Sequence, residues 1–552
     1  MAAGPPEAPE SRRLPGRTIA GELAGMLIAA LAAIALPRPR LLTELTRSVW
    51  VPTGDPYVIG DLWGSLFLTV RRSRGEGGCH TAFLQWPDGA DLCRDFPNNL
   101  FTDLLAPLVG AVGLPLGFNL GMLALLVTNG LAVGLAARLA GAGRWGGWLA
   151  AGLGAASPMV FYEVFAGRPV TAWWAPAIAA TALCVGSLAS WRRWAMLLPG
   201  LFCLMVALRI YPYGPAMLLP WTALWGLAAL ARGPAPWWGR ALRAAVGLGA
   251  AVAVAWWVSR TEYAGVLARW TRPLPFGDAE SRWGLATASV FQGLVHWHGI
   301  ALLLGGVAGG LVSARRWRGA WAAALLGALA LLAVGLGPVP FGDPRQGQPL
   351  PGAPFTWLME QVELMRGCAR PDRYVIAASL LLPVAAGVLL AQAGRLRRLG
   401  PALGVALFAA VGVFNHRFQP TAYLAWPPVE GLSGLEVDGG VVDAPLFFAG
   451  EDQAHMLPIV LMPAPRANPM RGERDNWSTA LHNRDAPLLQ ALYALQQGEP
   501  VAGPVAPGAE DPEVVVLHLQ LLDEGQREAH RALVAGAEVL EEDAQVEVYR
   551  VK

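Results

Sequence analysis

Side chains with acid-base chemistry gather in the stretch from residue 37 to residue 115. It carries six aspartates, which are Asp55, Asp61, Asp88, Asp91, Asp95 and Asp103. A carboxylate that lies beside a hydroxyl can take its proton, an effect worth about 10²- to 10⁴-fold in rate. A structural role is the alternative for each aspartate, because Gly54-Asp55-Pro56 and Pro87-Asp88-Gly89 both favour turns.

Three arginines, Arg366, Arg370 and Arg373, directly precede an apolar stretch, with Asp372 as the one acid among them. Guanidinium groups at a membrane interface can hold a phosphate or a pyrophosphate. Ordinary interface anchoring, or contact with anionic lipid headgroups, is the alternative. Four more polar residues are candidates for lining an acceptor site on the same face: Glu163, Arg168, Arg209 and Tyr211.

The elements that must position these groups are strongly apolar. Of the 552 residues, 54% are hydrophobic and 15% are charged, against roughly 25% charged residues in an ordinary soluble domain. The mean hydropathy is +0.40. This composition indicates a polytopic membrane protein, and it excludes a soluble enzyme, a disordered chain, a collagen-like fibre and a disulfide-rich secreted module.

Apolar length predicts about eleven membrane-spanning helices. The predicted ranges are 19–36, 116–137, 145–165, 170–190, 194–209, 213–231, 243–259, 297–313, 319–337, 374–393 and 400–414. A cleaved signal peptide is the alternative for the first range, although Pro37-Arg38-Pro39-Arg40 is a poor cleavage site.

The charges of the loops predict the orientation, because short cytoplasmic loops accumulate Lys and Arg. With the N-terminus inside, five inner loops carry arginine and no acid: they hold Arg138 and Arg144; Arg192 and Arg193; Arg232, Arg240 and Arg243; Arg315, Arg316 and Arg318; and Arg395, Arg397 and Arg398. All eight histidines then fall outside, with nearly every carboxylate of the first 430 residues. We expect a cytoplasmic N-terminus and an outer C-terminus.

The chain divides by charge near residue 430. Residues 431–552 hold 20 Asp and Glu against 8 Lys and Arg, whereas residues 1–430 hold 20 against 34. The predicted fold is therefore mainly α: a polytopic transmembrane helical bundle with a small extracytoplasmic α/β domain at the C-terminus. The predicted parts are a cytoplasmic tail (1–18), a transmembrane domain (19–414) with outer loops at 37–115, 260–296 and 338–373, a linker (415–430) and a soluble α/β domain (431–552).

Two outer loops are expected to contain short amphipathic helices that lie in the membrane interface. The first has apolar residues at helical spacing, followed by Arg71, Arg72 and Arg74: Leu62, Trp63, Leu66, Phe67 and Val70. The second shows the same pattern before the three arginines of the 366–373 stretch: Phe355, Leu358, Met359, Val362 and Leu364. Each helix would hold its charged neighbours at the mouth of the bundle.

The predicted C-terminal domain has apolar runs at 439–448 and 511–522 that read as strands, a helix within 523–544 and a closing strand at 545–552. It contains no nucleophile elbow, phosphate loop or paired metal ligands in its sequence. We expect it to bind the acceptor or to cap the site without being catalytic.

The cysteines suggest a second constraint on the first outer loop. Cys79 and Cys93 could form a disulfide there if that face is oxidising, and two free thiols are the alternative. Cys184 and Cys203 fall within predicted spans, where cysteine is usually an apolar filler.

These features together resemble the GT-C superfamily of membrane glycosyltransferases. The resemblance rests on a helix followed by a long outer loop that opens with GDPYVIGDLW, on the WPDG turn, and on three longer stretches: FNLGMLALLVTNGLAVGLAARLAG, SPMVFYEVFAGRPVTAWWAP and MRGCARPDRYVIAASLLL. It is most similar to bacterial multi-spanning members, and it covers most of residues 18–400 in pattern.

The resemblance implies transfer of a sugar from a polyprenyl-phosphate donor to a glycan, lipid or protein acceptor at the bacterial inner membrane. It implies that an aspartate after the first helix is the general base; Asp55 matches best and Asp61 is the alternate. Arg366, Arg370 and Arg373 would hold the lipid phosphate. A divalent cation, Mg or Mn, could bridge the aspartate and the phosphate, although no residue requires it. Membrane lipids are expected partners and nucleic acid is not.

Two other classes of protein fit the composition. A transporter or lipid flippase would carry ionisable groups at mid-span and broken helices, whereas the predicted spans are almost free of charge. A non-catalytic scaffold fits equally well. An opening of Asp55 and Arg373 onto one shared cavity would favour the enzyme.

Overall fold

The structure is a computed structural model of the chain. It describes the following residues: 16–51, 60–75, 80–81, 90–91, 100–188, 191–232, 236–262, 318–340, 348–366, 370–392, 422–433, 435–437, 439–446, 460–462 and 485–552.

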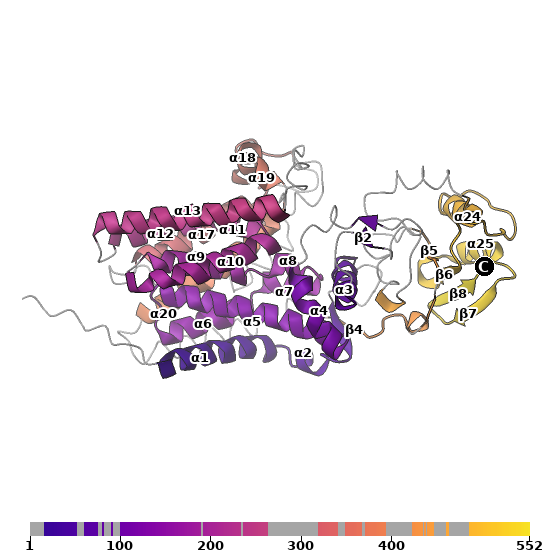
Figure 1. Ribbon diagram of the computed structural model, residues 1–552, viewed down its shortest axis with the longest axis horizontal. Helices are drawn as coiled ribbons and strands as arrows, with labels where there is room; N and C mark the ends of the chain where they lie inside the picture. Colours follow the sequence, from indigo (N-terminus) through magenta and orange to yellow (C-terminus); the bar gives the residue numbers. More distant parts are fainter. Residues whose placement is uncertain are drawn as a thin grey trace, which may run out of the picture.

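Long apolar helices lie side by side and form a bundle (Figure 1). Within the described ranges, six helical segments are long and apolar enough to cross a membrane: Leu116–Leu139, Arg144–Phe165, Pro169–Ser187, Arg193–Ile210, Trp237–Thr261 and Pro371–Val388. Their elements are α5 (Leu116–Leu139), α6 (Arg144–Ala155), α7 (Pro158–Phe165), α8 (Pro169–Ala172), α9 (Ala175–Ser187), a 3-10 helix η2 (Trp191–Met196), α10 (Leu197–Ile210), α13 (Trp237–Glu262) and α20 (Pro371–Gln392).

Shorter apolar helices complete the bundle. They are α1 (Gly16–Ala35), α4 (Leu100–Val112), α11 (Tyr213–Met217), α12 (Leu219–Arg232) and α17 (Arg318–Gly335). The predicted spans at 297–313 and 400–414 lie outside the described residues, and the other predicted ranges each coincide with an apolar helix. Helix α4 was not predicted; its 13 residues lie in the range 37–115, which was expected to be an outer loop.

Helix α20 is the centre of the bundle and α13 lies at its periphery. The apolar window of α20 is 94% buried, whereas that of α13 is 11% buried and exposes Trp256 and Trp257. Helices α6 and α20 cross closely because glycine faces glycine: a Cβ on Gly146 would come within 2.1 Å of the Gly387 carbonyl oxygen. The exposed apolar face of α13 suits contact with lipid tails.

Two of the long segments are broken near the same end of the bundle. Pro158 begins α7 after α6 has ended at Ala155, since proline fits the first turn of a helix but not its interior. Between α8 and α9, Trp173 leaves helical geometry with ψ 85°, and α9 begins at Ala175. We call the end of the bundle that carries these breaks the rim end; it faces the C-terminal elements in Figure 1.

Short elements cover the rim end. They are α2 (Arg40–Thr43), β1 (Ser48–Val51), α3 (Gly60–Ser73), β2 (His80–Thr81), β3 (Ala90–Asp91), α18 (Pro354–Gln361), α19 (Glu363–Arg366) and β4 (Ala422–Ala425). Strands β1 and β4 pair antiparallel, from Ser48 opposite Ala425 to Val51 opposite Ala422. The segment after α1 is therefore tied to residues that follow the last predicted span.

A four-stranded sheet forms near the C-terminus, in the order β5-β6-β8-β7. Its strands are β5 (Val441–Ala444), β6 (Val514–His518), β7 (Glu538–Glu542) and β8 (Val546–Arg550), with helices α24 (Pro487–Gln496) and α25 (Glu524–Leu533) and the 3-10 turns η5 (Glu430–Leu432) and η6 (Leu519–Leu521). Strand β5 is parallel to β6, and the other pairs are antiparallel. We call β5 to β8 with α24 and α25 the C-terminal sheet.

Candidate active site at the rim end of the bundle

The turn from α7 into α8 brings an acid, a base and a hydroxyl together. Gly167 has φ +73° and ends α7 in a Schellman motif, in which the Arg168 amide donates to the Glu163 carbonyl at 2.8 Å. Nη1 of Arg168 then lies 4.0 Å from Oε1 of Glu163. Thr171, in the single turn of α8, donates its hydroxyl to Oε2 of Glu163. The Glu163 carboxylate is thus buried but hydrogen-bonded.

The start of α20 adds a second set of charges. Arg370 donates from Nη2 to Oδ2 of the buried Asp372 at 3.1 Å, and Asp372 occupies the first turn of α20, where the helix dipole favours an acid. Arg373 donates from Nη1 to the hydroxyl of Tyr211 at 3.2 Å, and its guanidinium lies over the Tyr211 ring, 5.6 Å from the centroid.

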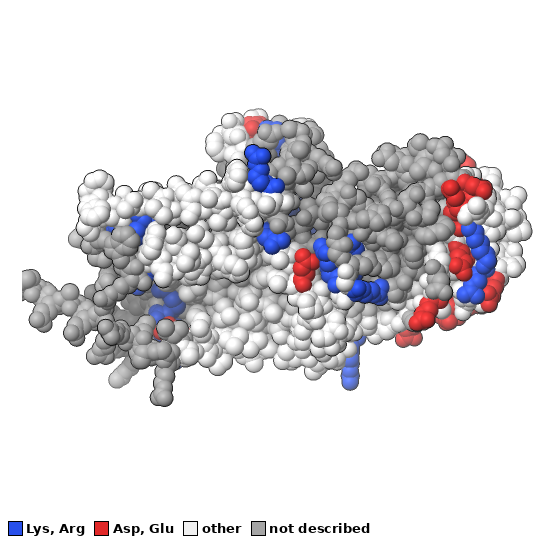
Figure 2. Space-filling view, viewed as in Figure 1, with Lys and Arg blue, Asp and Glu red and all other residues white. Residues whose placement is uncertain are grey.

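The two sets form one cluster. Glu163 interacts electrostatically with Asp372 and Arg373 as well as with Arg168. We call these residues the rim cluster: Glu163, Arg168, Thr171, Tyr211, Arg370, Asp372 and Arg373. In Figure 2 the sides of the helical bundle are mostly white, and the coloured charges gather towards its two ends and over the C-terminal sheet. The rim cluster is therefore a polar site at one end of an apolar bundle.

Helix α3 docks onto the turn that carries the acid. Ser65 donates its hydroxyl to the Gly167 carbonyl at 2.8 Å, and a Cβ on Gly167 would come within 2.2 Å of the Leu62 Cα. The predicted helix is present, but its apolar face is not laid into a membrane interface. Leu62, Trp63 and Leu66 are fully buried in the protein core, because they pack on this turn and on α4.

The structure describes the backbone at one of the two aspartates that were predicted as the general base. Asp61 lies in the first turn of α3, one residue before the Leu62 contact with Gly167. Asp55, Cys79 and Cys93 lie outside the described residues. The backbone of α3 therefore brings the first predicted outer loop up to the rim cluster.

The three predicted phosphate-binding arginines do not have equivalent surroundings. Arg366 donates from Nε to the Met359 carbonyl at 2.8 Å and from Nη2 to the Glu360 carbonyl at 3.2 Å, so it closes the end of α18. Arg370 is paired with Asp372, and Arg373 lies against Tyr211. Arg209, a predicted lining residue, occupies the last turn of α10, two residues before Tyr211.

A cation that the sequence did not single out lies beneath α7. The Arg38 guanidinium is buried over the Phe161 ring, 4.1 Å from its centroid. Burial lowers the pKa of this guanidinium to about 10, so Arg38 stays charged at neutral pH. Phe161, over whose ring Arg38 lies, precedes Glu163 by two residues in α7. Arg38 therefore places a positive charge against the helix that carries Glu163.

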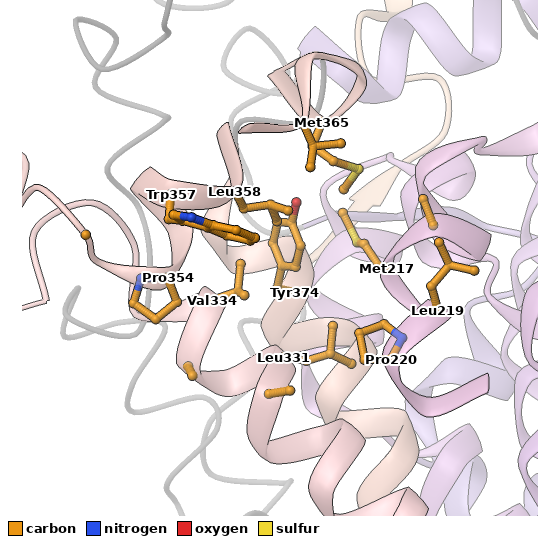
Figure 3. A pocket seen from close by; sticks show the side chains of 15 residues that line it. Met217, Leu219, Pro220, Leu331, Val334, Pro354, Trp357, Leu358, Met365 and Tyr374 are labelled. Carbon is orange, nitrogen blue, oxygen red and sulfur yellow. The ribbon is translucent and has the colours of Figure 1, made fainter. Parts of the chain in front are cut away.

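An apolar cavity of about 780 Å³ opens beside the rim cluster. It lies between α11 and α12, α17, the α18 and α19 hairpin, and the start of α20, and every lining residue is apolar or aromatic. Figure 3 shows the Tyr374 ring between Leu358 and Met217. Tyr374 follows Arg373 directly in α20, so one turn of helix reaches both the cavity and the rim cluster.

Sequence reasoning missed three residues of this site: Thr171, Gly167 and Asn129. A usable signal existed for Asn129, because an amide within an apolar span requires a hydrogen-bond partner. Asn129 is buried in α5 and bonds to Ala172 and Ala175 at the break between α8 and α9. In the described part of the chain no group of three or more His, Cys, Asp or Glu is arranged to hold a metal ion.

No protein-family model matches this chain, and no curated protein matches its sequence. Solved structures do match its fold. The arabinofuranosyltransferase AftD from mycobacteria aligns with a TM-score of 0.51 and 14% identity over 98% of this chain. This chain spans 42% of the length of AftD.

A second match covers both chains almost completely. ArnT from Cupriavidus metallidurans, solved with undecaprenyl phosphate bound, aligns with a TM-score of 0.50 and 13% identity, over 98% of this chain and 99% of ArnT. The chain therefore shares the fold of AftD and ArnT, which agrees with the fold that the resemblance of its sequence led us to expect.

Proposed function

We propose that this protein is an integral membrane glycosyltransferase that moves a sugar from a polyprenyl-phosphate donor to a glycan, lipid or protein acceptor. The rim end would face the periplasm of a bacterial inner membrane, with the N-terminus in the cytoplasm. The proposed parts are the tail 1–18, the transmembrane domain 19–414, the linker 415–430 and the periplasmic domain 431–552, which would cap the site or bind the acceptor.

The observation that carries this proposal is that neighbouring residues of α20 belong to an apolar cavity and to the charged rim cluster. A donor with an isoprenoid chain needs an apolar wall for its tail and a polar seat for its phosphate. Tyr374 lines the cavity, and the preceding residue Arg373 belongs to the rim cluster. The matched structure of ArnT contains undecaprenyl phosphate, a ligand with these two parts.

The site would work by positioning and charge. Asp55, or Asp61 as the alternate, would take the proton of the acceptor hydroxyl as its oxygen attacks the anomeric carbon. The bond from that carbon to the phosphate oxygen breaks, and the polyprenyl phosphate leaves with inversion. Fixed positive charge at the leaving phosphate lowers the barrier. Arg373 is best placed to supply it, followed by Arg370, whereas Arg366 is engaged by carbonyl oxygens of α18.

The remaining candidates would shape the acceptor side. Glu163, Arg168 and Tyr211 would line the acceptor site, with Arg209 behind them. A disulfide between Cys79 and Cys93 would brace the first outer loop. A divalent cation, Mg or Mn, could assist at the phosphate.

The test is transfer in cells that lack the protein. Lipid-linked sugars and envelope glycans are compared in the deletion strain and in strains complemented with the wild type or with Asp55→Asn. The deletion is expected to accumulate a polyprenyl-linked sugar and to lose a glycan, and Asp55→Asn is expected to behave as the deletion while still inserting in the membrane. Full activity of Asp55→Asn would remove Asp55 from the mechanism, leaving Asp61 as the candidate base.

Two arginine variants sharpen the test. Arg373→Gln is expected to lower transfer by about tenfold or more, because a charge-assisted hydrogen bond to phosphate is lost. Arg366→Gln is the matched control and is expected to retain transfer. Equal losses in both variants would contradict the order of roles given to the arginines. Unchanged lipids and glycans in the deletion strain would contradict the proposed function itself.

A further inference from the structure

Asn129 holds the break between α8 and α9 together. Its side chain is fully buried in the middle of α5. Its amide nitrogen donates to the Ala172 carbonyl at 2.8 Å, and its amide oxygen accepts from the Ala175 N–H at 2.7 Å. An interrupted helix leaves backbone groups that must be satisfied inside an apolar bundle. The Asn129 side chain therefore satisfies the Ala172 carbonyl before the break and the Ala175 N–H after it.

The segment that Asn129 holds contacts two parts of the rim cluster: Glu163 and, through Tyr211, Arg373. Thr171, just before the break, donates to the Glu163 carboxylate. Trp174, within the break, donates from Nε1 to the Thr171 carbonyl at 2.8 Å. The Trp174 ring meets the Tyr211 ring edge-on, with centroids 6.1 Å apart.

Tyr211 in turn holds Arg373 through its hydroxyl and its ring face. Glu163 and Arg373 are therefore joined through Thr171, Trp174 and Tyr211. A shift of the backbone at Ala172 would move the Thr171 hydroxyl and the Trp174 ring together.

We propose that Asn129 is a positioning residue for the donor phosphate. It touches no reacting atom; it fixes the break, and the break sets the Tyr211 ring against which Arg373 lies. This inference rests on the proposed function, since the phosphate is the one that Arg373 would bind. Loss of the Asn129 amide releases Trp174 and Tyr211, and Arg373 then loses its fixed orientation.

Asn119 provides a matched control in the same helix. It too is fully buried in α5, and its amide nitrogen donates to the Leu45 and Ser48 carbonyls at 2.9 and 2.7 Å. These bonds hold the segment before β1 and do not involve the break between α8 and α9. Substitution of either asparagine by leucine removes bonds to backbone groups, so both variants should lose comparable stability.

The experiment measures binding of undecaprenyl phosphate and of undecaprenol to the purified full-length protein, together with its melting temperature. The wild type is expected to prefer the phosphate. Asn129→Leu should lose about tenfold of that preference, the effect of one misplaced charge-assisted hydrogen bond. Asn119→Leu should keep it at a similar fall in melting temperature. Asn129→Asp should recover part of it, because a carboxylate can still accept from Ala175.

Two results would overturn the inference alone: an unchanged phosphate preference in Asn129→Leu, or an equal loss in Asn119→Leu. A wild type that binds undecaprenol as tightly as undecaprenyl phosphate would overturn the proposed donor and this inference together. The two failures are therefore distinguishable.

Discussion

The rim cluster and the C-terminal sheet both contain carboxylates that lie partly or fully out of solvent, and some of those in the C-terminal sheet hold backbone amides. In the C-terminal sheet, Asp511 accepts from the backbone amides of Leu488 and Leu489 at the start of α24. Asp543 accepts from the backbone amides of Gln545 and Val546 in the turn into β8. These acids complete helix ends and turns.

The carboxylates of the rim cluster meet side chains, as Asp443 and Glu547 of the C-terminal sheet also do with His518 and Arg531. Glu163 accepts from the Thr171 hydroxyl and lies near Arg168, and Asp372 is bound by Arg370. Side chains can exchange partners when a substrate arrives, whereas a helix end that loses its cap is destabilised. We expect the chemistry in the rim cluster, because Arg373 of that cluster directly precedes Tyr374 of the apolar cavity, and we expect a supporting role for the C-terminal sheet.

Neutralising one buried carboxylate in each region should give the largest contrast. Glu163→Gln is expected to lower sugar transfer by about 10²-fold, the order of magnitude seen when one preorganised polar group is removed from an active site. The amide can still accept from Thr171, so the protein should insert normally. Glu547→Gln in β8 should leave transfer unchanged. Transfer assays on membranes with matched protein amounts check both, and equal losses would erase the contrast between the regions.

The Gly167 turn should be the most sensitive point of the rim end to a single methyl group. Gly167→Ala combines a left-handed backbone with a clash against Leu62, which should cost about 2 to 4 kcal/mol. Gly352→Ala is the control, because Gly352 has φ +80° but open space around its Cβ, so about 1 to 2 kcal/mol is expected. Thermal melts in detergent compare the two. Equal shifts would show that α3 is not fixed by this contact.

Removing a helix cap should test the supporting role of the C-terminal sheet. Asp511→Ala leaves the Leu488 and Leu489 amides without their acceptor and should destabilise α24 by about 1 to 2 kcal/mol. Hydrogen exchange across 485–496 should increase while transfer stays at the wild-type level. A parallel loss of transfer would mean that the C-terminal sheet contributes directly to the site.

The smallest expected effect is a dependence of the C-terminal sheet on pH. A hydrogen bond from Arg531 lowers the pKa of the Glu547 carboxyl below its ordinary value of 4.5. The stabilisation is therefore present above pH 4.5 and is lost as the pH falls through the lowered pKa. Exchange of the β6 and β8 amides should rise below that pH in the wild type and much less in Glu547→Gln. An identical acid response in both proteins would assign the effect to another group.

The sequence predicted the apolar helices well, because a long apolar stretch in a membrane satisfies its backbone hydrogen bonds by forming a helix. It also predicted α3 from its spacing, but not the partner of its apolar face, since periodicity identifies a buried side without naming what covers it. The three arginines near residue 370 also looked alike in the sequence, because residue type and spacing do not say which group each side chain contacts. Only the fold distinguishes Arg366 on carbonyl oxygens from Arg373 on Tyr211.

Other parts of the fold left a weaker mark on the sequence. Strand β7 lies in a range where only a helix was expected, because it is a charged edge strand whose residues are mostly exposed and show little alternation. Helix α24 was not foreseen. Asn129 and Gly167 contact backbone groups that are distant in sequence; the amide of Asn129 in an apolar span indicates that a partner exists, but no local pattern says which one.

The pairing of β1 with β4 constrains the order in which the parts of the chain can fold. Strand β1 can pair only after Ala425, the partner of Ser48 about 380 residues later, has been synthesised, and such distant contacts form late. Until residues 422–425 have been synthesised, β1 offers an unpaired edge with which another chain could pair. A chain that ends before residue 422 would therefore leave β1 without its partner strand.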